Sequence, residues 1–241
     1  MAPDPAVILD RLSIQEPLVG VYDAPDPALF EPLVAPENQE CIFASYNAWH
    51  KGKTLHLTRE QYGCFGSGHI LGLPRRPREQ MVQFLWGEEG LRATPELMGT
   101  WWDSAPQYHP KNAHLLIGPL RADQYESLLT VTFLVNPDQL SVLATGAGYY
   151  SRPDDIPPVI APFGSGCMMA LSLFADLDAP QAIIGATDQA MRKYLKPWMM
   201  AFTVTRPMYE RLCDWAADKR SSLHTGFLEG LIKARGGSLG A

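Results

Sequence analysis

One short stretch occurs twice in this chain, far apart along it. CFGSGHILGL runs from Cys64 to Leu73, and PFGSGCMMAL runs from Pro162 to Leu171. Both contain Phe-Gly-Ser-Gly, both carry a cysteine at the edge of the loop, and both continue into an apolar segment. We therefore expect two copies of one strand–loop–helix unit, each presenting a thiol beside exposed backbone N–H groups.

The segments around the two loops suggest one plan for each half. Each half reads as strand, helix, strand, glycine loop and helix, with short strands at 54–57, 128–135 and 159–161. No flexible linker separates the halves, so we predict a single domain over 1–241, with halves at about 15–110 and 113–217. The expected fold is α/β or α+β, an internally duplicated strand–helix–strand–loop–helix unit around a pseudo-twofold axis.

Several local patterns predict individual elements. A helix begins near residue 40 with a narrow stripe of small side chains, and another covers 78–88. Thr94 followed by a proline predicts a helix start, and 100–112 reads as a long aromatic loop. A further helix is expected over 206–217.

Composition and charge indicate which classes of partner and which cellular compartment to expect. The net charge of −6 argues against a nucleic-acid partner, which needs a basic surface. No run of about eighteen apolar residues occurs, and the N-terminus lacks the basic region of a signal peptide. We expect a cytoplasmic protein with no membrane partner, whose four cysteines are free thiols, metal ligands or catalysts.

The cysteines separate into two groups. Cys41, Cys64 and Cys167 lie at a helix start or a loop edge, whereas Cys213 lies inside an expected helix and reads as a small buried hydrophobe. Three thiolates can hold an iron–sulfur cluster with one iron open to substrate. Alternatively, one thiolate acts as a nucleophile or a redox thiol. The absence of Cys-x-x-Cys argues against a zinc ribbon.

The glycine loops supply further candidate site residues. His69 stands where the second loop has Cys167, which makes it a candidate fourth ligand or base; a histidine satisfied by a backbone group is the alternative. The catalytic candidates are Cys64, Cys167 and His69. The candidate anion-binding residues are Gly66, Ser67, Gly68, Gly164, Ser165 and Gly166, whose amides stand at helix starts.

Charged and aromatic side chains outside the loops are less specific. Arg192 is a candidate to orient an anionic substrate, with a solvated surface charge as the alternative. Trp101, Trp102 and Tyr108 either line an apolar pocket or form a contact between copies of a homo-oligomer, and at least one tryptophan is expected in the core.

The motifs around these residues resemble one known family. They comprise Cys41–Ala44, the stretch KGKTLHLTRE, CFGSG, Leu-Gly-Leu and, in the second half, Gly166-Cys167, Ile184-Gly185 and Met191–Tyr194. Over roughly 15–217 the chain resembles the domain of unknown function 169 (DUF169) family. The resemblance implies a shared sulfur site, because the family's recurring cysteines match Cys41, Cys64 and Cys167. The chain departs from the family pattern at Ser67 and at Thr187-Asp188.

Our leading hypothesis is one composite site near the pseudo-axis. It holds an iron–sulfur cluster or a similar metal centre, ligated by Cys41, Cys64 and Cys167, and acts on a small anionic or sulfur-containing molecule. The alternative is a non-metal thiolate enzyme or a small-ligand-binding protein, with His69 as a base. A third interpretation is that the cysteines only fill space.

Overall fold

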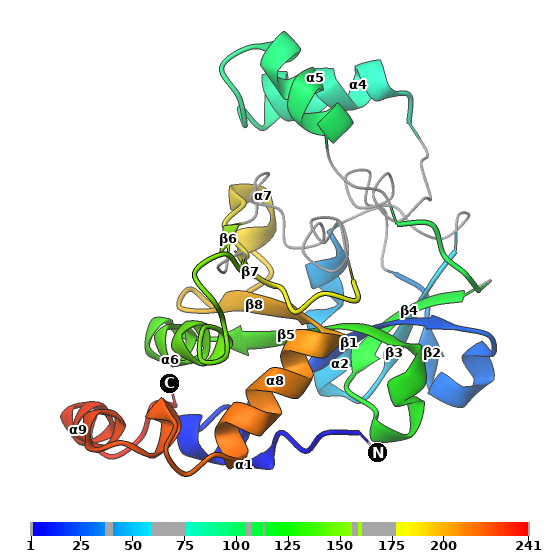
Figure 1. Ribbon diagram of the computed structural model, residues 1–241. Coiled ribbons are helices and arrows are strands. Elements are labelled where there is room, and N and C mark those ends of the chain that lie inside the picture. The colour runs from blue at the N-terminus through cyan, green and yellow to red at the C-terminus, as the bar shows by residue number, and fades with distance from the viewer. Residues whose placement is uncertain are drawn as a thin grey trace.

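The fold is built on one mixed sheet. The computed structural model describes residues 2–36, 41–58, 76–104, 108–112, 114–155 and 177–240, and the backbone of 159–160. The sheet has eight strands in the order β2-β3-β4-β1-β5-β8-β7-β6 (Figure 1). The strands are β1 (Val19–Ala24), β2 (Leu33–Val34), β3 (Thr54–Leu57), β4 (His114–Pro119), β5 (Leu128–Val135), β6 (Val159–Ile160), β7 (Ala182–Gly185) and β8 (Met200–Thr205).

The strand order follows one rule on both sides of the central β1–β5 pair. β4, β3 and β2 continue the sheet on one side, and β8, β7 and β6 continue it on the other. Both outermost pairs, β2–β3 and β6–β7, are parallel, and every other neighbouring pair is antiparallel. The sheet thus groups β4 with β1–β3, although we expected the second half to begin at 113.

This strand order also changes the interpretation of the repeated sequence. The stretch 65–68 follows β3, whereas the stretch 163–166 follows β6, the strand before β7. The first stretch therefore comes after the third strand of its side and the second after the second strand. Each stretch does come after a helix and then a strand, as expected, but the two strands hold different positions in their sides of the sheet. The duplication around a pseudo-twofold axis stays a prediction.

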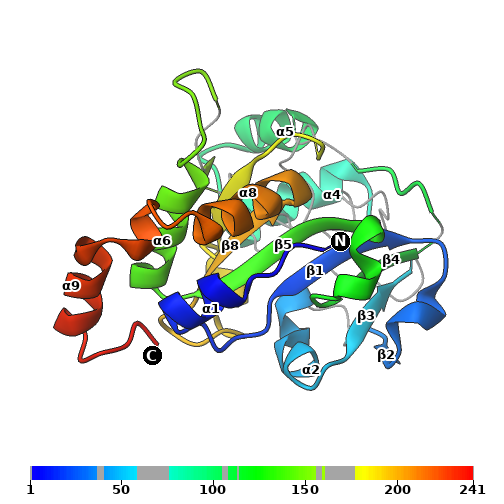
Figure 2. The ribbon, with the colours of Figure 1, turned by 60° about the horizontal axis from the view of Figure 1, so that its bottom comes forward.

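The helices form a layer on each face of the sheet (Figures 1 and 2). One face, called the lower face, packs against α1, α6, α8 and α9. The other, called the upper face, packs against α2, α4, α5 and α7. The bounds are α1 (Ala6–Leu12), α2 (Tyr46–His50), α4 (Arg78–Gln83), α5 (Pro95–Ser104), α6 (Pro137–Ala147), α7 (Gln189–Arg192), α8 (Arg206–Ala217) and α9 (Gly226–Ala234).

Strand alternation decides which side chains face each layer. On β5, Val131 and Phe133 belong to the lower apolar cluster, while Leu134 belongs to the upper cluster. Because successive side chains of a strand point to opposite faces, both faces of this strand are buried. The mixed α/β architecture is thereby explained by apolar residues on both sides of the central strands.

Three expected elements differ from the structure. The segment predicted as a helix from about 40 is a 3-10 turn, Ile42–Ser45, followed by the short α2. It buries Phe43, Tyr46 and Trp49 instead of a stripe of small residues, because large side chains remove more apolar area from water. Likewise α4 continues as a π-helical turn, Phe84–Glu88, and α5 extends through Ser104 because Trp102, 2 % exposed, turns inward.

Two glycines are expected to respond oppositely to alanine. A Cβ at Gly146 of α6 would lie 2.8 Å from Cε3 of Trp215, which is fully buried in α8. Gly146→Ala should therefore lower the free energy of unfolding by about 1–2 kcal/mol. Gly230→Ala in the exposed middle of α9 meets no described atom within 4 Å and should raise it by about 1 kcal/mol. Urea unfolding of both variants checks the prediction; equal signs would contradict this helix packing.

Candidate functional site

The predicted site residues divide between described and undescribed parts of the chain. Cys64, His69 and Cys167 lie outside the described residues, as do the six loop residues proposed to bind an anion: Gly66, Ser67, Gly68, Gly164, Ser165 and Gly166. Cys41 is described. It is a free thiol, partly buried against the upper apolar cluster, immediately before the turn that leads into α2. The structure thus places one of the three predicted thiols on the upper face.

The fourth cysteine is separated from that face. Cys213 lies in α8, in the lower apolar cluster, and is 9 % exposed. Burial raises the pKa of its thiol to about 12, so the thiolate form is strongly disfavoured at neutral pH. The prediction that Cys213 is a small buried hydrophobe is confirmed.

Arg192 has partners of its own chain. Its guanidinium donates to the carbonyl oxygens of Met199, Pro197 (2.5 Å), Ala186 (3.4 Å) and Lys196 (3.4 Å). These hydrogen bonds tie the segment between β7 and β8 to the Arg192 side chain, which extends from the end of α7. A role in orienting substrate stays a prediction, and any such role would use donors that also hold this turn together.

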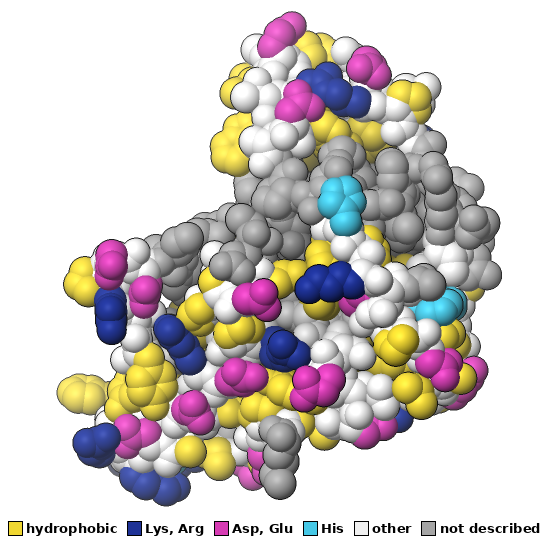
Figure 3. Space-filling model, turned by 45° about the vertical axis from the view of Figure 1, so that its right-hand side comes forward, with side chains coloured by type: hydrophobic (Ala, Val, Ile, Leu, Met, Phe, Trp, Pro, Cys, Tyr) yellow, Lys and Arg dark blue, Asp and Glu magenta, His cyan; other side chains and the backbone are white. Residues whose placement is uncertain are grey.

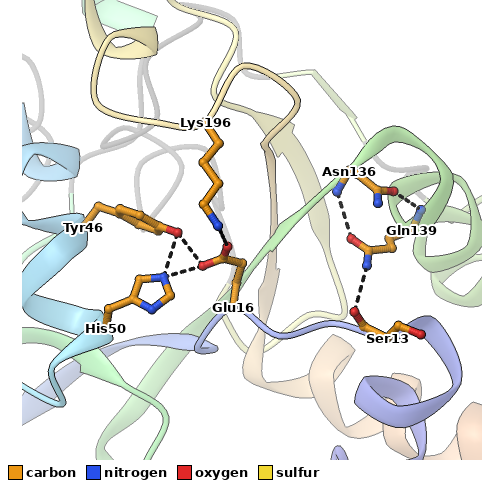
Figure 4. Close-up of polar contacts among 7 residues, drawn as sticks. All are labelled: Ser13, Glu16, Tyr46, His50, Asn136, Gln139 and Lys196. Carbon is orange, nitrogen blue, oxygen red and sulfur yellow. Dashed lines mark hydrogen bonds and ion pairs between the residues drawn. The ribbon is translucent and has the colours of Figure 1, made fainter. Parts of the chain in front are cut away.

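A polar cluster that sequence reasoning missed lies nearby, beside the start of β1 (Figure 4). The Oε2 atom of Glu16 accepts hydrogen bonds from the Tyr46 hydroxyl and from Nε2 of His50, and these two donors lie 2.7 Å from each other. The Nζ atom of Lys196 donates to Oε1 of Glu16 at 2.6 Å. The carboxylate is 8 % exposed, whereas His50 and Lys196 reach the surface.

The electrostatics of this Glu16 cluster favour an ionised carboxylate. Burial acts to raise the pKa of Glu16, but hydrogen bonds from Lys196, Tyr46 and His50 outweigh it, and the net effect lowers the pKa. Burial, together with the negative charge of Glu16, raises the pKa of Tyr46. The cluster therefore holds a carboxylate anion among neutral and cationic donors, an arrangement that fixes three chain segments relative to one another.

The segment that carries Glu16 is held from its other side as well (Figure 4). Gln139 of α6 donates to the carbonyl oxygens of Leu12 at 2.9 Å and Ser13 at 3.4 Å. Its own position is set by a capping box with Asn136 at the start of α6. Of these contacts, the sequence contains one local signal, because Tyr46 and His50 are four residues apart on one helix face. Glu16 and Lys196 are brought together only by the tertiary fold.

Two carboxylates, Glu89 and Asp188, interact on the upper side of the sheet. Glu89 follows the π-helical turn after α4, and Asp188 precedes α7. Burial and the nearby charge of Asp188 raise the pKa of Glu89 to about 7, and burial raises the pKa of Asp188. Asp188 also accepts a hydrogen bond from the amide of Ala190 at 2.8 Å, which caps α7. This cap gives a structural role to the aspartate at one of the positions where the chain departs from the family pattern.

The aromatic residues named from the sequence have different roles. Trp102 is in the core, as expected for at least one tryptophan, while Trp101 is 39 % exposed. The Tyr108 hydroxyl donates to the buried Asp23 at the end of β1. Asp23 and Tyr108 contribute to a polar cavity of about 180 Å³ that Arg206 also lines.

A larger cavity opens beside the N-terminal segment. It has a volume of about 330 Å³ and a mainly apolar lining that includes Pro5, Leu9, Leu120 and Tyr209. On the face seen in Figure 3, acidic and basic side chains are interspersed over the described surface. That mixture does not form the basic stripe of a nucleic-acid-binding face.

The described ranges contain neither a cluster of metal-ligating side chains nor a membrane-spanning helix. There, no three His, Cys, Asp or Glu side chains are close enough together to hold a metal ion. None of the described helices is long and apolar enough to cross a membrane.

Comparison with known proteins identifies the family. A family model described as DUF169, uncharacterised ArCR, COG2043, matches residues 8–214. No curated protein and no solved structure matches the chain. The matched region contains the whole sheet and the predicted cysteine motifs, so this chain belongs to the DUF169 family.

Proposed function

We propose that this is a cytoplasmic metal-centre protein in which Cys41, Cys64 and Cys167 ligate an iron–sulfur cluster. The cluster acts on a small anionic or sulfur-containing molecule. The proposal is supported by the placement of the cysteines along the chain. Each of the three stands equally far after the last residue of a strand, namely Val34, Leu57 and Ile160. Cys213 differs, because it lies within a helix on the lower face.

The parallel pairing of β2 and β3 supports the first two ligands. The chain leaves two parallel neighbouring strands at the same edge of the sheet, so the segments carrying Cys41 and Cys64 start close together. Cys41 is partly buried on the upper face. A partly buried thiol in an apolar surrounding suits an iron–sulfur cluster, whose potential depends on burial and on hydrogen bonds to sulfur.

The strand order supports an internal duplication with new equivalences. If β1–β4 correspond to β5–β8, then β2 matches β6 and β3 matches β7. Cys41 and Cys167 then become the matching thiols, since each follows the second strand of its half. The pseudo-twofold axis would pass between β1 and β5, and Cys64 would have no thiol counterpart.

Iron and acid-labile sulfide measured after anaerobic purification test the metal centre. We expect both in the wild-type chain, and a loss of most of both in Cys41→Ser, Cys64→Ser and Cys167→Ser. Cys213→Ser is the matched control and should keep them, because its thiol is held protonated in the opposite layer. A colourless chain without iron after reconstitution would refute the proposal, as would full iron content in all three single variants.

The apolar cavity of about 330 Å³ favours a second candidate, a small-ligand-binding protein without a metal. A cavity of this size with an apolar lining is typical of a small-molecule site. The thiolate version of this alternative predicts that Cys64 or Cys167 reacts with iodoacetamide at neutral pH faster than a free thiol. Slow alkylation of both would exclude an activated nucleophile.

A further inference from the structure

The geometry points to a second metal site, formed by His56 and His114, that takes a divalent transition metal such as Ni²⁺ or Cu²⁺. His56 lies on β3 and His114 begins β4, which pairs with β3. Nε2 of His56 and Nδ1 of His114 are 3.0 Å apart, and the ring centroids are 5.0 Å apart. Two ring nitrogens from adjacent strands thus lie within hydrogen-bond distance of each other.

The pair lies on the lower side of the sheet and is not fully buried. His56 alternates with Leu55 and Leu57, which face the upper cluster, so its ring stands on the lower side of the sheet. Both histidines are half-buried. They lie on β3 and β4, whereas α6 and α8 pack over the strands β5 and β8. The 3-10 turn Pro27–Phe30 also contacts β4, but both histidines keep part of their surface exposed.

The separation of the nitrogens fits metal coordination. Two imidazole nitrogens bound at about 2.1 Å with an angle of about 90° at the metal lie about 3.0 Å apart. Such an angle belongs to square-planar or octahedral ions, and imidazole suits nickel and copper among the ions that adopt these geometries. Since no third His, Cys, Asp or Glu of the described chain joins the pair, water fills the remaining positions.

The protonation state also suits binding. At present one ring donates its N–H to the other, so the two rings share one hydrogen between them. A metal takes both nitrogens when that hydrogen moves to the outer nitrogen of its ring, with no net loss of a proton.

Titration of the full chain with Ni²⁺ tests the site. We expect binding in the wild-type chain, and affinity weaker by about tenfold or more in both His56→Asn and His114→Asn. His109→Asn, which changes an exposed histidine, is the control and should bind as the wild type does. Equal affinity in the wild type and both variants, or no binding by the wild type, would reduce the pair to a hydrogen bond and overturn the inference.

A second experiment uses the wild-type chain, so its result does not depend on whether the histidine variants fold. Ni²⁺ should protect His56 and His114 from modification by diethyl pyrocarbonate, as read by mass spectrometry, and modification that is unaffected by Ni²⁺ would overturn the site. Cys41→Ser should keep the nickel affinity and His56→Asn should keep the iron content. The two metal proposals can therefore fail independently.

Discussion

Asp23→Ala is expected to lower the free energy of unfolding by about 3 kcal/mol. The Asp23 carboxylate is 5 % exposed and accepts hydrogen bonds from the Tyr108 hydroxyl and from the amides of Lys111 (2.6 Å) and Asn112 (2.9 Å). Alanine leaves these three donors without their acceptor in a site that water reaches poorly, and each such loss costs about 1 kcal/mol or more. The segment 108–112, which leads into β4, would lose its anchor.

Thermal and urea unfolding measure this effect. For a chain of this length the loss corresponds to a fall in Tm of roughly 6–12 °C. Tyr108→Phe removes one of the three donors and should cost about 1 kcal/mol. The control is Asp10→Ala, because the Asp10 side chain is exposed, and its effect should stay within about 0.5 kcal/mol. An equally small effect of Asp23→Ala would show that the anchor contributes little.

Glu16→Gln is expected to cost about 2 kcal/mol at pH 7, and this cost should disappear in acid. A glutamine keeps the shape of the side chain, but its amide group turns a donor toward either Lys196 or the Tyr46–His50 pair. The folded state lowers the pKa of Glu16, so the stabilisation by this carboxylate is present above its ordinary pKa of 4.5. It is lost as the pH falls through the lower, folded-state pKa.

The measurement is urea unfolding of wild type and variant at a series of pH values from 7 down to 3. The difference in unfolding free energy should shrink at the acid end, because wild-type Glu16 becomes protonated there. Glu229→Gln is the matched control. Glu229 pairs with Arg11 at 2.6 Å on the surface, where its side chain is 58 % exposed, and such pairs contribute about 1 kcal/mol or less. A difference for Glu16→Gln that stays constant with pH would contradict the ionised cluster.

Local patterns in the sequence predicted several elements closely. The strands at 54–57 and 128–135 and the helix at 206–217 have the expected bounds. The Thr94 hydroxyl accepts from the amide of Leu97 at 3.1 Å, as expected of a helix start. These features depend on alternation, periodicity and capping within a few residues, which is why the sequence alone is sufficient.

Two predictions of local structure were wrong where burial against distant strands decides the conformation. The loop expected at 100–112 begins with five residues of α5, because the indole of Trp102 is buried against the upper cluster. The helix expected from 40 became a 3-10 turn and one short helix around Phe43 and Trp49. In both cases the apolar surface to be covered decided the local structure, and that surface is formed by distant strands.

The sequence by itself determined the mixed α/β class, the family and the separation of Cys213 from the other cysteines. All three follow from local patterns or motifs along the chain. Only the tertiary structure decided which strands are neighbours, and with them that 65–68 and 163–166 belong to different connections. It also created the Glu16 cluster and the His56–His114 pair, because hydrogen bonds between residues far apart in the chain form only after strand order and register bring the side chains together.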